Sequence, residues 1–325
     1  MYILLVLYSL NGIINLHNKV FDQEAEMDIS LVGVPIMYGC DREGVEYGPD
    51  KLREKNILKI FRDKNHRTYD FGNLYVPNTP ISEKYAYHKK IKYLKPIVEI
   101  NNNLSHLVYS VLSSKTFPFI IGGDHSLALG SIAGASKFYD NLAVIWLDAH
   151  GDINTCDTSP SGNFHGMPLS AASGIGDPSL INIYYNGPKI NPQNIYIVGA
   201  RDLDEGEIKI AKNLKLNLYT MDAIKQIGIM STIDNILDKI KASNIDGVHL
   251  SFDIDVLDKK LVPGTGTPVS NGFSLEESKQ ILERFLSTGL IKSMDFVELN
   301  PLLDIDDSTA DICIDLIDSI SSALK

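Results

Sequence analysis

The chain has 325 residues, 44% of them hydrophobic, and it carries a formal net charge of -11 from 30 Lys and Arg against 41 Asp and Glu. This length and apolar content predict one large α/β domain or two small ones, while the acidic balance and the lack of a basic patch argue against nucleic acid as a partner. The three cysteines are widely spaced without a CxxC pair, which argues against a disulfide framework or a thiolate zinc site and favours a reducing cytoplasm.

The N-terminal stretch MYILLVLYSLNGIINL is apolar enough to resemble a signal peptide. It lacks a positively charged start and a small-residue cleavage site, and it is short for a membrane span. Met27 stands directly before a strand-like run at residues 29–34. We therefore expect residues 1–26 to be an extension outside the core, residues 27–325 to form a single domain, and the protein to have no membrane partner.

From Met27 onward, apolar runs alternate with amphipathic segments, and several runs are continuous, as is typical of parallel strands buried on both faces. The alternation predicts a parallel sheet with right-handed crossovers and helices on both faces. Ser274 and Glu277 have the spacing of a capping box at a helix start. Strands are expected at 29–34, 68–71, 118–122, 142–148, 195–200, 216–219, 248–253 and 291–297. Helices are expected at 49–58, 82–112, 126–137, 205–213, 232–242, 274–287 and 307–324.

The stretch LAVIWLDAHGD, at residues 142–152, is an apolar strand with an abrupt polar end. Its polar side chains, Asp148, His150 and Asp152, occupy alternate positions, and alternate residues of an extended backbone point to one face. A core strand that merely runs into a polar loop would give the same pattern, so the stretch alone leaves both readings open.

Two further predicted strands end in side chains of the same kind. The segment SFDID places Asp253 and Asp255 two residues apart, and the segment IGGDHS carries Asp124 and His125. Ligands of parallel α/β sheets bind at the C-terminal edge of the strands. Three such strand ends therefore predict a site built at this edge.

Pooled, these strand ends offer two imidazoles and four carboxylates, too many ligands for one ion. Clustered carboxylates repel one another and are driven to protonate unless cations compensate them. A donor set rich in oxygen and without thiolate favours Mn²⁺ over Zn²⁺, and paired divalent ions activate a water for hydrolysis of a carbon or phosphorus centre. Asp124 is expected to be structural, or to replace His125 as a ligand. The predicted ligands are His125, Asp148, His150, Asp152, Asp253 and Asp255.

Several ordered motifs resemble the signatures of the ureohydrolase family. They are GPDKLR at 48–53, GGDHS at 122–126, DAHGDIN at 148–154, SFDID at 251–255 and GTGTP at 264–268. The loop SGNFHGMP at 161–168 resembles the arginase branch of that family, and the preceding Pro160 is similar to its bacterial form. The resemblance runs from about Met27 to the C-terminus, which is nearly the whole chain.

The resemblance implies a three-layer α/β/α fold with a central eight-stranded parallel sheet, the arginase-like architecture. It also implies two Mn²⁺ ions per chain, bridged by the carboxylates of Asp148 and Asp253. The remaining ligands implied by position are His125 and Asp152 for one ion, and His150 and Asp255 for the other.

The resemblance also implies hydrolysis of the guanidinium group of L-arginine to L-ornithine and urea. In the family, a metal-bridging hydroxide attacks the guanidinium carbon. Asp152 matches the residue that hydrogen-bonds this hydroxide and passes a proton to the leaving amine, and His165 matches the mobile proton-shuttle histidine. Glu298 matches the carboxylate that binds the guanidinium, a role that suits the bidentate pairing of a planar cation.

The family further implies where the substrate is selected and how the protein assembles. The α-carboxylate and the α-amino group of the substrate are contacted by residues outside the metal ligands. A homotrimer or a homohexamer is the family expectation. The matching positions are Asn154, Ser161 and Asn163 for the carboxylate, Asp204 and Glu207 for the amino group, and Thr267 in the pocket wall.

Three alternatives remain open at this point. Another ureohydrolase, such as an agmatinase, a guanidinobutyrase or a formimidoylglutamase, would share the metal site and differ in the outer loop. A deacetylase of the related fold is disfavoured, because six strand-end ligands imply two ions rather than one. A non-catalytic, metal-stabilised binding protein is disfavoured as well, because every ligand position, His165 and Glu298 carry chemically competent side chains.

Overall fold

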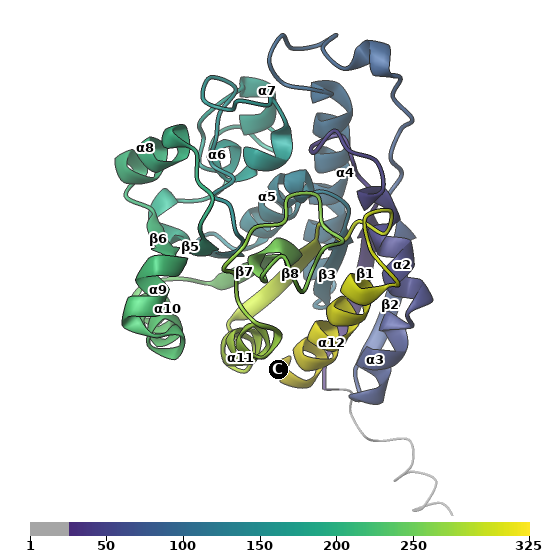
Figure 1. The fold of residues 1–325 in the computed structure, drawn as a ribbon, viewed down its shortest axis with the longest axis vertical. Helices are drawn as coiled ribbons and strands as arrows, with labels where there is room; N and C mark the ends of the chain where they lie inside the picture. Colours follow the sequence, from purple (N-terminus) through teal and green to yellow (C-terminus); the bar gives the residue numbers. More distant parts are fainter. Residues whose placement is uncertain (1–25) are drawn as a thin grey trace, which may run out of the picture.

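The computed structural model describes residues 26–325, so the expected extension before Met27 lies almost entirely outside the described residues. Its centre is an eight-stranded sheet in which all neighbouring strands are parallel, in the order β2-β1-β3-β8-β7-β4-β5-β6 (Figure 1). Each of the eight predicted strands is confirmed to within about two residues at its ends. The strands are β1 Asp28–Val34, β2 Arg67–Asn73, β3 Phe117–Gly122, β4 Leu142–Leu147, β5 Ile195–Ala200, β6 Asn217–Thr220, β7 Gly247–Asp253 and β8 Ile291–Val297.

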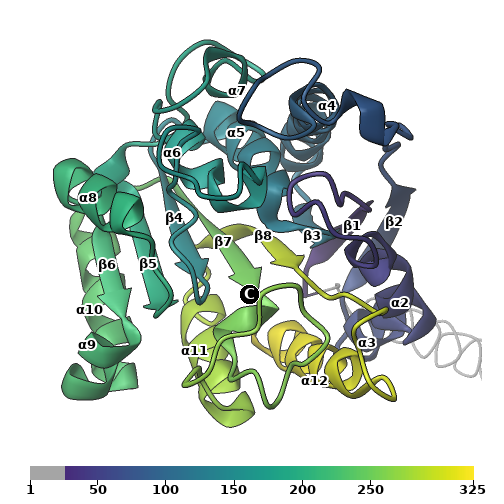
Figure 2. The same cartoon turned by 45° about the horizontal axis from the view of Figure 1, so that its top comes forward.

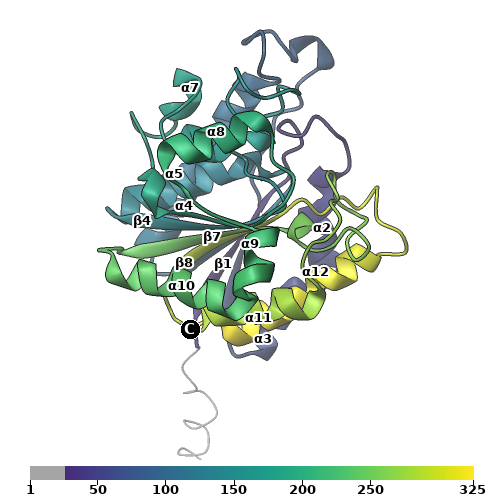
Figure 3. The same cartoon turned by 60° about the vertical axis from the view of Figure 1, so that its left-hand side comes forward.

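Helices cover both faces of this sheet, as Figure 3 shows, and each face has its own hydrophobic core. Strands β3, β4, β5 and β7 are consequently buried along their whole length. One core is covered by α2 Gly48–Glu54, α3 Ile57–Asp63, α9 Met221–Ile227, α10 Ile229–Ala242, α11 Leu275–Leu286 and α12 Ser308–Ala323. The other is covered by α4 Leu94–Ser113, α5 Ala128–Phe138, α6 Pro168–Ala172, α7 Pro178–Ile181 and α8 Glu205–Leu214.

Short 3₁₀ turns connect several of these elements, and three of them carry predicted site residues. They are η1 Val45–Tyr47, η2 Ile81–Glu83, η3 His125–Leu127, η4 Phe164–Gly166, η5 Pro192–Asn194 and η6 Ile254–Val256. The predicted capping box of α11 is confirmed, because Ser274 N donates to Glu277 Oε2 at 2.8 Å and Glu277 N donates to Ser274 Oγ at 3.3 Å. Among the described residues, no helix is long and apolar enough to span a membrane.

Two helix predictions were wrong in extent. The helix expected at 49–58 is broken at Asn56, whose φ of 64° is left-handed and separates α2 from α3. The helix expected at 82–112 begins only at Leu94, because Tyr93 has a φ of 51° and residues 84–92 form turns and bends. The prediction extended the helix too far because the segment before Leu94 is also amphipathic. The left-handed backbone of Tyr93 sets the true start of α4.

The strand order brings the predicted site residues to one edge of the sheet (Figure 2). Strands β8 and β7 lie between β3 and β4, so four strand ends are consecutive. The register pairs Leu147 of β4 with Phe252 of β7, and Asp253 of β7 with Val297 of β8. The residues that follow these positions therefore emerge at one level, at the C-terminal edge where such sheets bind ligands.

Candidate metal centre

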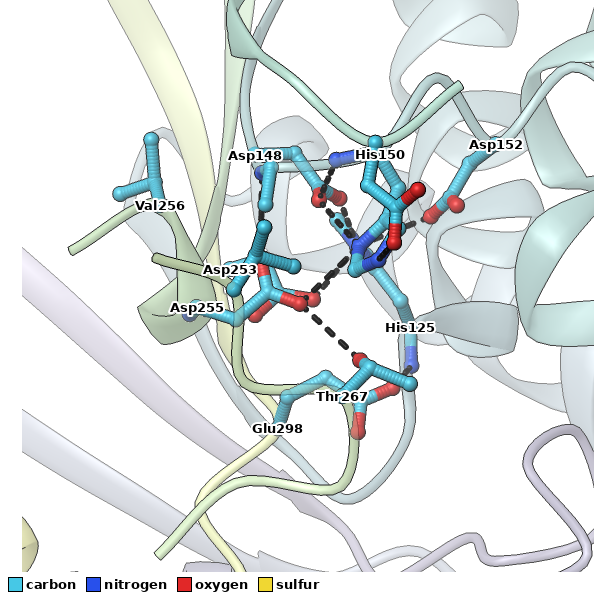
Figure 4. Close-up of polar contacts among 12 residues, drawn as sticks. His125, Asp148, His150, Asp152, Asp253, Asp255, Val256, Thr267 and Glu298 are labelled. Atoms are coloured by element: carbon cyan, nitrogen blue, oxygen red, sulfur yellow. Dashed lines mark hydrogen bonds and ion pairs between the residues drawn. The ribbon is translucent and has the colours of Figure 1, made fainter. Parts of the chain in front are cut away.

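All six predicted metal ligands lie in one cluster at this edge (Figure 4). Two groups of ligand atoms, each within 4.8 Å of one another, are present: His125 with Asp148 and Asp152, and Asp148 with His150 and Asp255. Asp253 joins the first group, because its Oδ2 lies 3.3 Å from His125 Nδ1. Two ion-sized groups that share Asp148 match the arrangement expected for a pair of cations.

Asp148 is the shared carboxylate because each of its oxygens faces a different group. Its Oδ2 lies 3.0 Å from His125 Nδ1, and its Oδ1 lies 3.3 Å from His150 Nδ1. Backbone and ring donors fix this orientation: His150 N donates to Oδ1 at 2.7 Å, and Trp146 Nε1 donates to Oδ2 at 3.0 Å. The side chain is fully buried.

The imidazole of His125 is oriented from behind, so that one nitrogen faces the cluster. Its Nε2 is 2.8 Å from Ser251 Oγ, and its ring stacks on Trp146 at a centroid distance of 3.9 Å. Its buried Nδ1 has no hydrogen-bond partner among the described residues, although carboxylate oxygens of Asp148 and Asp152 lie within 3.3 Å. Ser251 Oγ donates to Asp295 Oδ2 at 3.3 Å and therefore accepts from Nε2–H of the neutral ring, which leaves Nδ1 as a lone pair, the way protein ligands are oriented toward metals.

Two residues of the site have strained backbones. Asp152 has a φ of 51° and Glu298 a φ of 71°, in the left-handed region that residues other than Gly rarely occupy. Such conformations cost about 1–3 kcal/mol each and concentrate at functional sites. Here they turn the side chains of these two residues back toward the strand ends from which the chain is leaving.

The carboxylates of the cluster repel one another, and the two histidines offset this repulsion at Asp148. Burial works against ionisation of Asp148, but His125 and His150 hold the pKa of its carboxyl well below the ordinary value. Burial and the charge of Asp148 raise the pKa of Asp152 to about 6. Burial likewise raises the pKa values of Asp253 and Asp255, and each is raised further by a neighbouring carboxylate. Divalent cations would relieve this repulsion, and the donor set of imidazole and carboxylate without thiolate fits a hard to borderline ion such as Mn²⁺.

A polar cavity of about 150 Å³ opens directly above the cluster. The metal-side groups that reach it are His150, Asp152 and Asp253. The outer residues predicted to select the substrate line it as well, together with the predicted proton-shuttle residue His165, from segments that follow β4, β5 and β7. These are Asn154, Ser161, Asn163, His165, Asp204, Glu207 and Thr267.

The loops that form the outer wall are tied to one another by side chains. Asn154 Nδ2 donates to Asp204 Oδ2 at 2.9 Å, joining the loop after β4 to the start of α8. The buried carboxylate of Glu207 accepts from the backbone N of Asp204 at 2.9 Å and from the backbone N of Ile153 at 3.2 Å. Burial raises the pKa of Glu207 to about 7. Thr267 Oγ1 donates to Asp255 Oδ2 at 3.0 Å, which connects this wall to the cluster.

Glu298 and His165 lie beside each other; of the two, only His165 lines the cavity, and the Glu298 side chain is 1% exposed. His165 Nδ1 is 3.3 Å from Glu298 Oε1, and the same oxygen accepts from the backbone N of His125 at 2.8 Å. Burial lowers the basicity of His165, but the Glu298 carboxylate reverses this and raises the pKa of the imidazole. Glu298 is therefore anchored to a ligand-bearing segment rather than free to swing.

Asp124 is the one strand-end carboxylate that points away from the cluster. Its Oδ2 accepts from the backbone N of Gly39 at 2.8 Å and of Cys40 at 3.2 Å, and its Oδ1 accepts from Ser126 N at 3.0 Å. The structural role expected for Asp124 agrees with these contacts, and the alternative, in which it replaces His125 as a ligand, does not.

Two residues near the ligands were not predicted from the sequence. Ser251, which contacts His125, lies on β7 two and four residues before Asp253 and Asp255, so the same alternation could have identified it. Asp202 lines the cavity with its Oδ2 3.9 Å from His150 Nε2. Its position immediately after the end of β5 was the available signal.

Comparison with known proteins agrees with this geometry. The model of the arginase family matches residues 27–322. The arginase of Bacillus subtilis (strain 168) is 43% identical over 293 residues, which cover 90% of this chain and 97% of that protein. The native arginase structure from Bacillus caldovelox has a TM-score of 0.85 at 37% identity, covering 91% of this chain and 98% of the other.

A more distant structure, Entamoeba histolytica arginase in complex with L-ornithine, still has a TM-score of 0.83 at 32% identity, over 92% of this chain and 99% of the other. The family match and these identities extend over almost the entire described chain, and they include the segments that supply the clustered histidines and aspartates. The chain is therefore a hydrolase of the arginase family.

Proposed function

We propose that this hydrolase is an arginase, which uses two Mn²⁺ ions per chain to hydrolyse L-arginine to L-ornithine and urea. The observation that carries the proposal is the pair of buried His and Asp groups sharing Asp148 beneath a polar cavity. The relatives named above are arginases over nearly the same length of chain. The buried Nδ1 of His125 makes no hydrogen bond and faces three carboxylates at 3.0–3.3 Å, which supports a metal at the first group.

Each proposed ligand has a defined place. His125, Asp148, Asp152 and Asp253 would hold one ion, and His150, Asp255 and the shared carboxylates the other. When bound, the ions would lower the pKa of a water molecule and supply the nucleophile for attack on the guanidinium carbon. The protein contributes by holding these six side chains rigidly through the strand ends and their backbone donors.

Two further side chains are proposed to handle the substrate's guanidinium end. Glu298 would bind the guanidinium by a charge-assisted hydrogen bond. The contacts with His125 N and His165 Nδ1 both use Oε1 of Glu298, which leaves Oε2 for the substrate. Asp152 would accept the proton of the water and return it to the leaving amine. His165, held at 3.3 Å from Glu298 and facing the cavity, would pass to solvent a separate proton, the one that a fresh water loses when the nucleophile is regenerated.

The outer wall is proposed to recognise the amino-acid end of the substrate. Asn154, Ser161 and Asn163 would receive the α-carboxylate, and Asp204 the α-ammonium. Glu207 would support that end chiefly by holding the start of α8, because its two oxygens already accept backbone hydrogen bonds. Thr267 would fix the cavity floor through Asp255.

Other ureohydrolases remain the nearest alternative, because they would use the same metal centre. They differ in whether the substrate has an α-carboxylate and an α-ammonium. A site that hydrogen-bonds these groups rejects an analogue without them by up to about 10⁴-fold, because its polar groups are then left unpaired. Agmatine, which lacks the carboxylate, is the informative competitor.

The decisive measurement is kcat/KM for urea release from L-arginine and from agmatine, with wild type and Asp204→Ala. We expect strong preference for L-arginine over agmatine in wild type. Because agmatine keeps the amine that Asp204 would bind, Asp204→Ala should lower kcat/KM for both compounds, with the preference retained and manganese still bound. Glu205→Ala is the control, since Glu205 is exposed on the same turn and pairs with Lys209. Equal or faster turnover of agmatine by wild type would reject the arginase assignment.

The remaining proposals concern the extent, location and assembly of the protein. Residues 27–325 are proposed to form the catalytic domain, with residues 1–26 outside it, so a chain that begins at Met27 should fold and hydrolyse L-arginine. A cytoplasmic location fits the three free cysteines. A homotrimer or homohexamer is proposed from the family, and sedimentation velocity would test it.

A further inference from the structure

The amide of Asn163 is held in a single orientation by two partners from distant parts of the chain. Its Nδ2 donates to the backbone O of Cys40 at 2.9 Å, and its Oδ1 accepts from Lys92 Nζ at 2.7 Å. An ammonium can only donate and a carbonyl can only accept, so these partners exclude the flipped amide. Asn163 lines the cavity, and one N–H of its amide is left without either of these partners.

Lys92 is itself fixed in place and mostly buried. Its side chain is 14% exposed, and its Nζ lies 2.9 Å from Asp41 Oδ2, a carboxylate that also binds Lys84. Its backbone N donates to Gly162 O at 3.1 Å, next to Asn163. We call Lys84, Lys92 and Asp41 the lysine cage. Its two ammonium groups and one carboxylate carry a net positive charge directly behind the cavity wall.

The partners of the amide are anchored to the metal end of the molecule. Asp124, which precedes the ligand His125, holds the backbone N of Gly39 and of Cys40. The backbone N of His165 also donates to Gly39 O, at 3.2 Å. The loop that carries Cys40 and Asp41 is therefore fixed relative to the cluster, so that the amide of Asn163 is positioned relative to both ends of the substrate.

We propose that Lys92 is a positioning residue for recognition of the substrate's α-carboxylate. Lys92 fixes the orientation of the Asn163 amide, so that an N–H rather than the carbonyl oxygen points toward the carboxylate. It also adds positive charge behind that amide. The inference rests on the proposed arginase function, and it names a residue outside the cavity lining on which substrate affinity depends. The inner cluster is acidic, so the lysine cage also marks which end of the cavity accepts an anion.

The test compares Lys92→Met with Lys84→Met in the manganese-loaded protein. Both variants remove one ammonium group from the same carboxylate, but only Lys92 contacts Asn163. Loss of an oriented hydrogen bond to a charged group corresponds to roughly a tenfold change or more. We expect KM for L-arginine to rise about tenfold in Lys92→Met, with kcat and manganese content near wild type, and to change less than about twofold in Lys84→Met.

Lys92→Gln and Lys92→Glu form a second pair that keeps the test valid if the methionine variant is poorly folded. The two side chains have nearly the same shape, but Gln retains an N–H donor for Asn163 Oδ1 and Glu can only accept. The rise in KM should be smallest for Lys92→Gln, intermediate for Lys92→Met and largest for Lys92→Glu. Equal effects of Gln and Glu would reduce Lys92 to a packing role and overturn the proposal.

A double-mutant cycle shows whether Lys92 acts through Asn163. In an Asn163→Ala background, Lys92→Met should add little to the KM already reached, and calorimetric affinity for L-ornithine should follow the same pattern. Full additivity, or a Lys92→Met variant that behaves like Lys84→Met, would reject the positioning role while leaving arginase activity intact. A wild-type protein that does not hydrolyse L-arginine would instead reject the proposed function.

Discussion

The metal cluster and the outer wall of the cavity are built in different ways. Every proposed ligand lies at the C-terminal end of a strand or in the short segment that follows it, and strand register sets where these segments begin. The outer wall consists of loops whose side chains are held by distant partners, as Asn154 is by Asp204 and Asn163 by Lys92. Rigid sheet edges suit a centre that must keep ligand geometry, whereas loops allow the substrate contacts to differ between related enzymes.

This difference suggests that chemistry and substrate choice can be separated by mutation. Changes at the strand ends should remove metal and turnover together. Changes in the outer wall should alter KM or selectivity while metal stays bound. The predictions below test this separation, beginning with the largest expected effect.

Asp253→Ala removes a carboxylate that contacts the first ligand group and lies next to the second. Metal ions supply several kcal/mol of transition-state stabilisation, so we expect kcat/KM for L-arginine to fall roughly a thousandfold or more, with loss of manganese measured by elemental analysis. Asp258→Ala is the control, because Asp258 follows the same strand but its carboxylate accepts from the backbone of Lys260 and Asn271, in the loop, instead of facing the cluster. Two bound ions and near-normal activity in Asp253→Ala would refute its assignment as a ligand.

Ser251→Ala tests the support behind a ligand rather than the ligand itself. Ser251 Oγ contacts His125 Nε2 at 2.8 Å, and partners of this kind contribute about 10–100-fold in metal affinity. Manganese titration of chelator-treated protein should show a loss of that size. Ser293→Ala is matched in burial and contacts His249 at 2.8 Å instead of a ligand, so an equal loss in both variants would point to general destabilisation of the sheet.

The sequence was sufficient to predict the inner part of the site because its signals are local. The alternation of polar residues at the end of an apolar run singled out Asp148, His150 and Asp152, and parallel strands bring such ends to one edge. The eight strands were predicted for the same reason. The extended backbone expected through Asp152 was wrong, because β4 ends at Leu147, residues 148–150 are bends and Asp152 has a φ of 51°. The missed Ser251 obeys this alternation too, so its omission was a failure to extend the pattern inward along the strand.

The outer wall was predicted only through resemblance to a family, because its contacts are not local. Nothing near Asn163 in the sequence indicates that Lys92 and Cys40 hold its amide. The helix predicted over residues 82–112 even placed Lys92 inside a regular element, whereas Tyr93 ends an irregular segment with a left-handed backbone. Tertiary contacts fix these loops, and composition does not reveal them.

Glu207 lies where the two regions meet, since its carboxylate joins the backbone of Ile153, after Asp152, to that of Asp204. Burial raises its pKa to about 7 from 4.5, so unfolding releases a proton between these pH values. The free energy of unfolding should therefore fall as pH rises from about 4.5 to 7. In metal-free protein, Glu207→Gln should make this fall shallower by roughly 1 kcal/mol per pH unit at most.

Urea denaturation at several pH values would measure this difference. Asp124 and Asp152, whose pKa values are each raised to about 6, keep part of the pH dependence in both proteins. Glu205→Gln is the matched control on the same helix, because Glu205 is exposed and pairs with Lys209. Identical pH dependence in wild type and Glu207→Gln would show that the Glu207 carboxylate is ionised throughout this range in the folded protein.

The smallest expected effect belongs to Ser161→Ala in the outer loop. Ser161 lines the cavity, and its Oγ accepts from the backbone N of Asn163 at 3.2 Å. The variant would lose one hydrogen bond to the charged substrate carboxylate and slightly loosen this turn. Because Ser161 is exposed, water can replace part of that bond, so the change should be worth only about 1 kcal/mol. KM for L-arginine should therefore rise a few-fold, with kcat and manganese unchanged.

Ser159→Ala provides the comparison, since Ser159 supports the turn through Gly162 N at 3.0 Å without being a proposed substrate contact. A larger rise in KM for Ser161→Ala than for Ser159→Ala assigns the effect to the carboxylate, whereas loss of manganese in either variant would contradict the separation between the cluster and its outer wall.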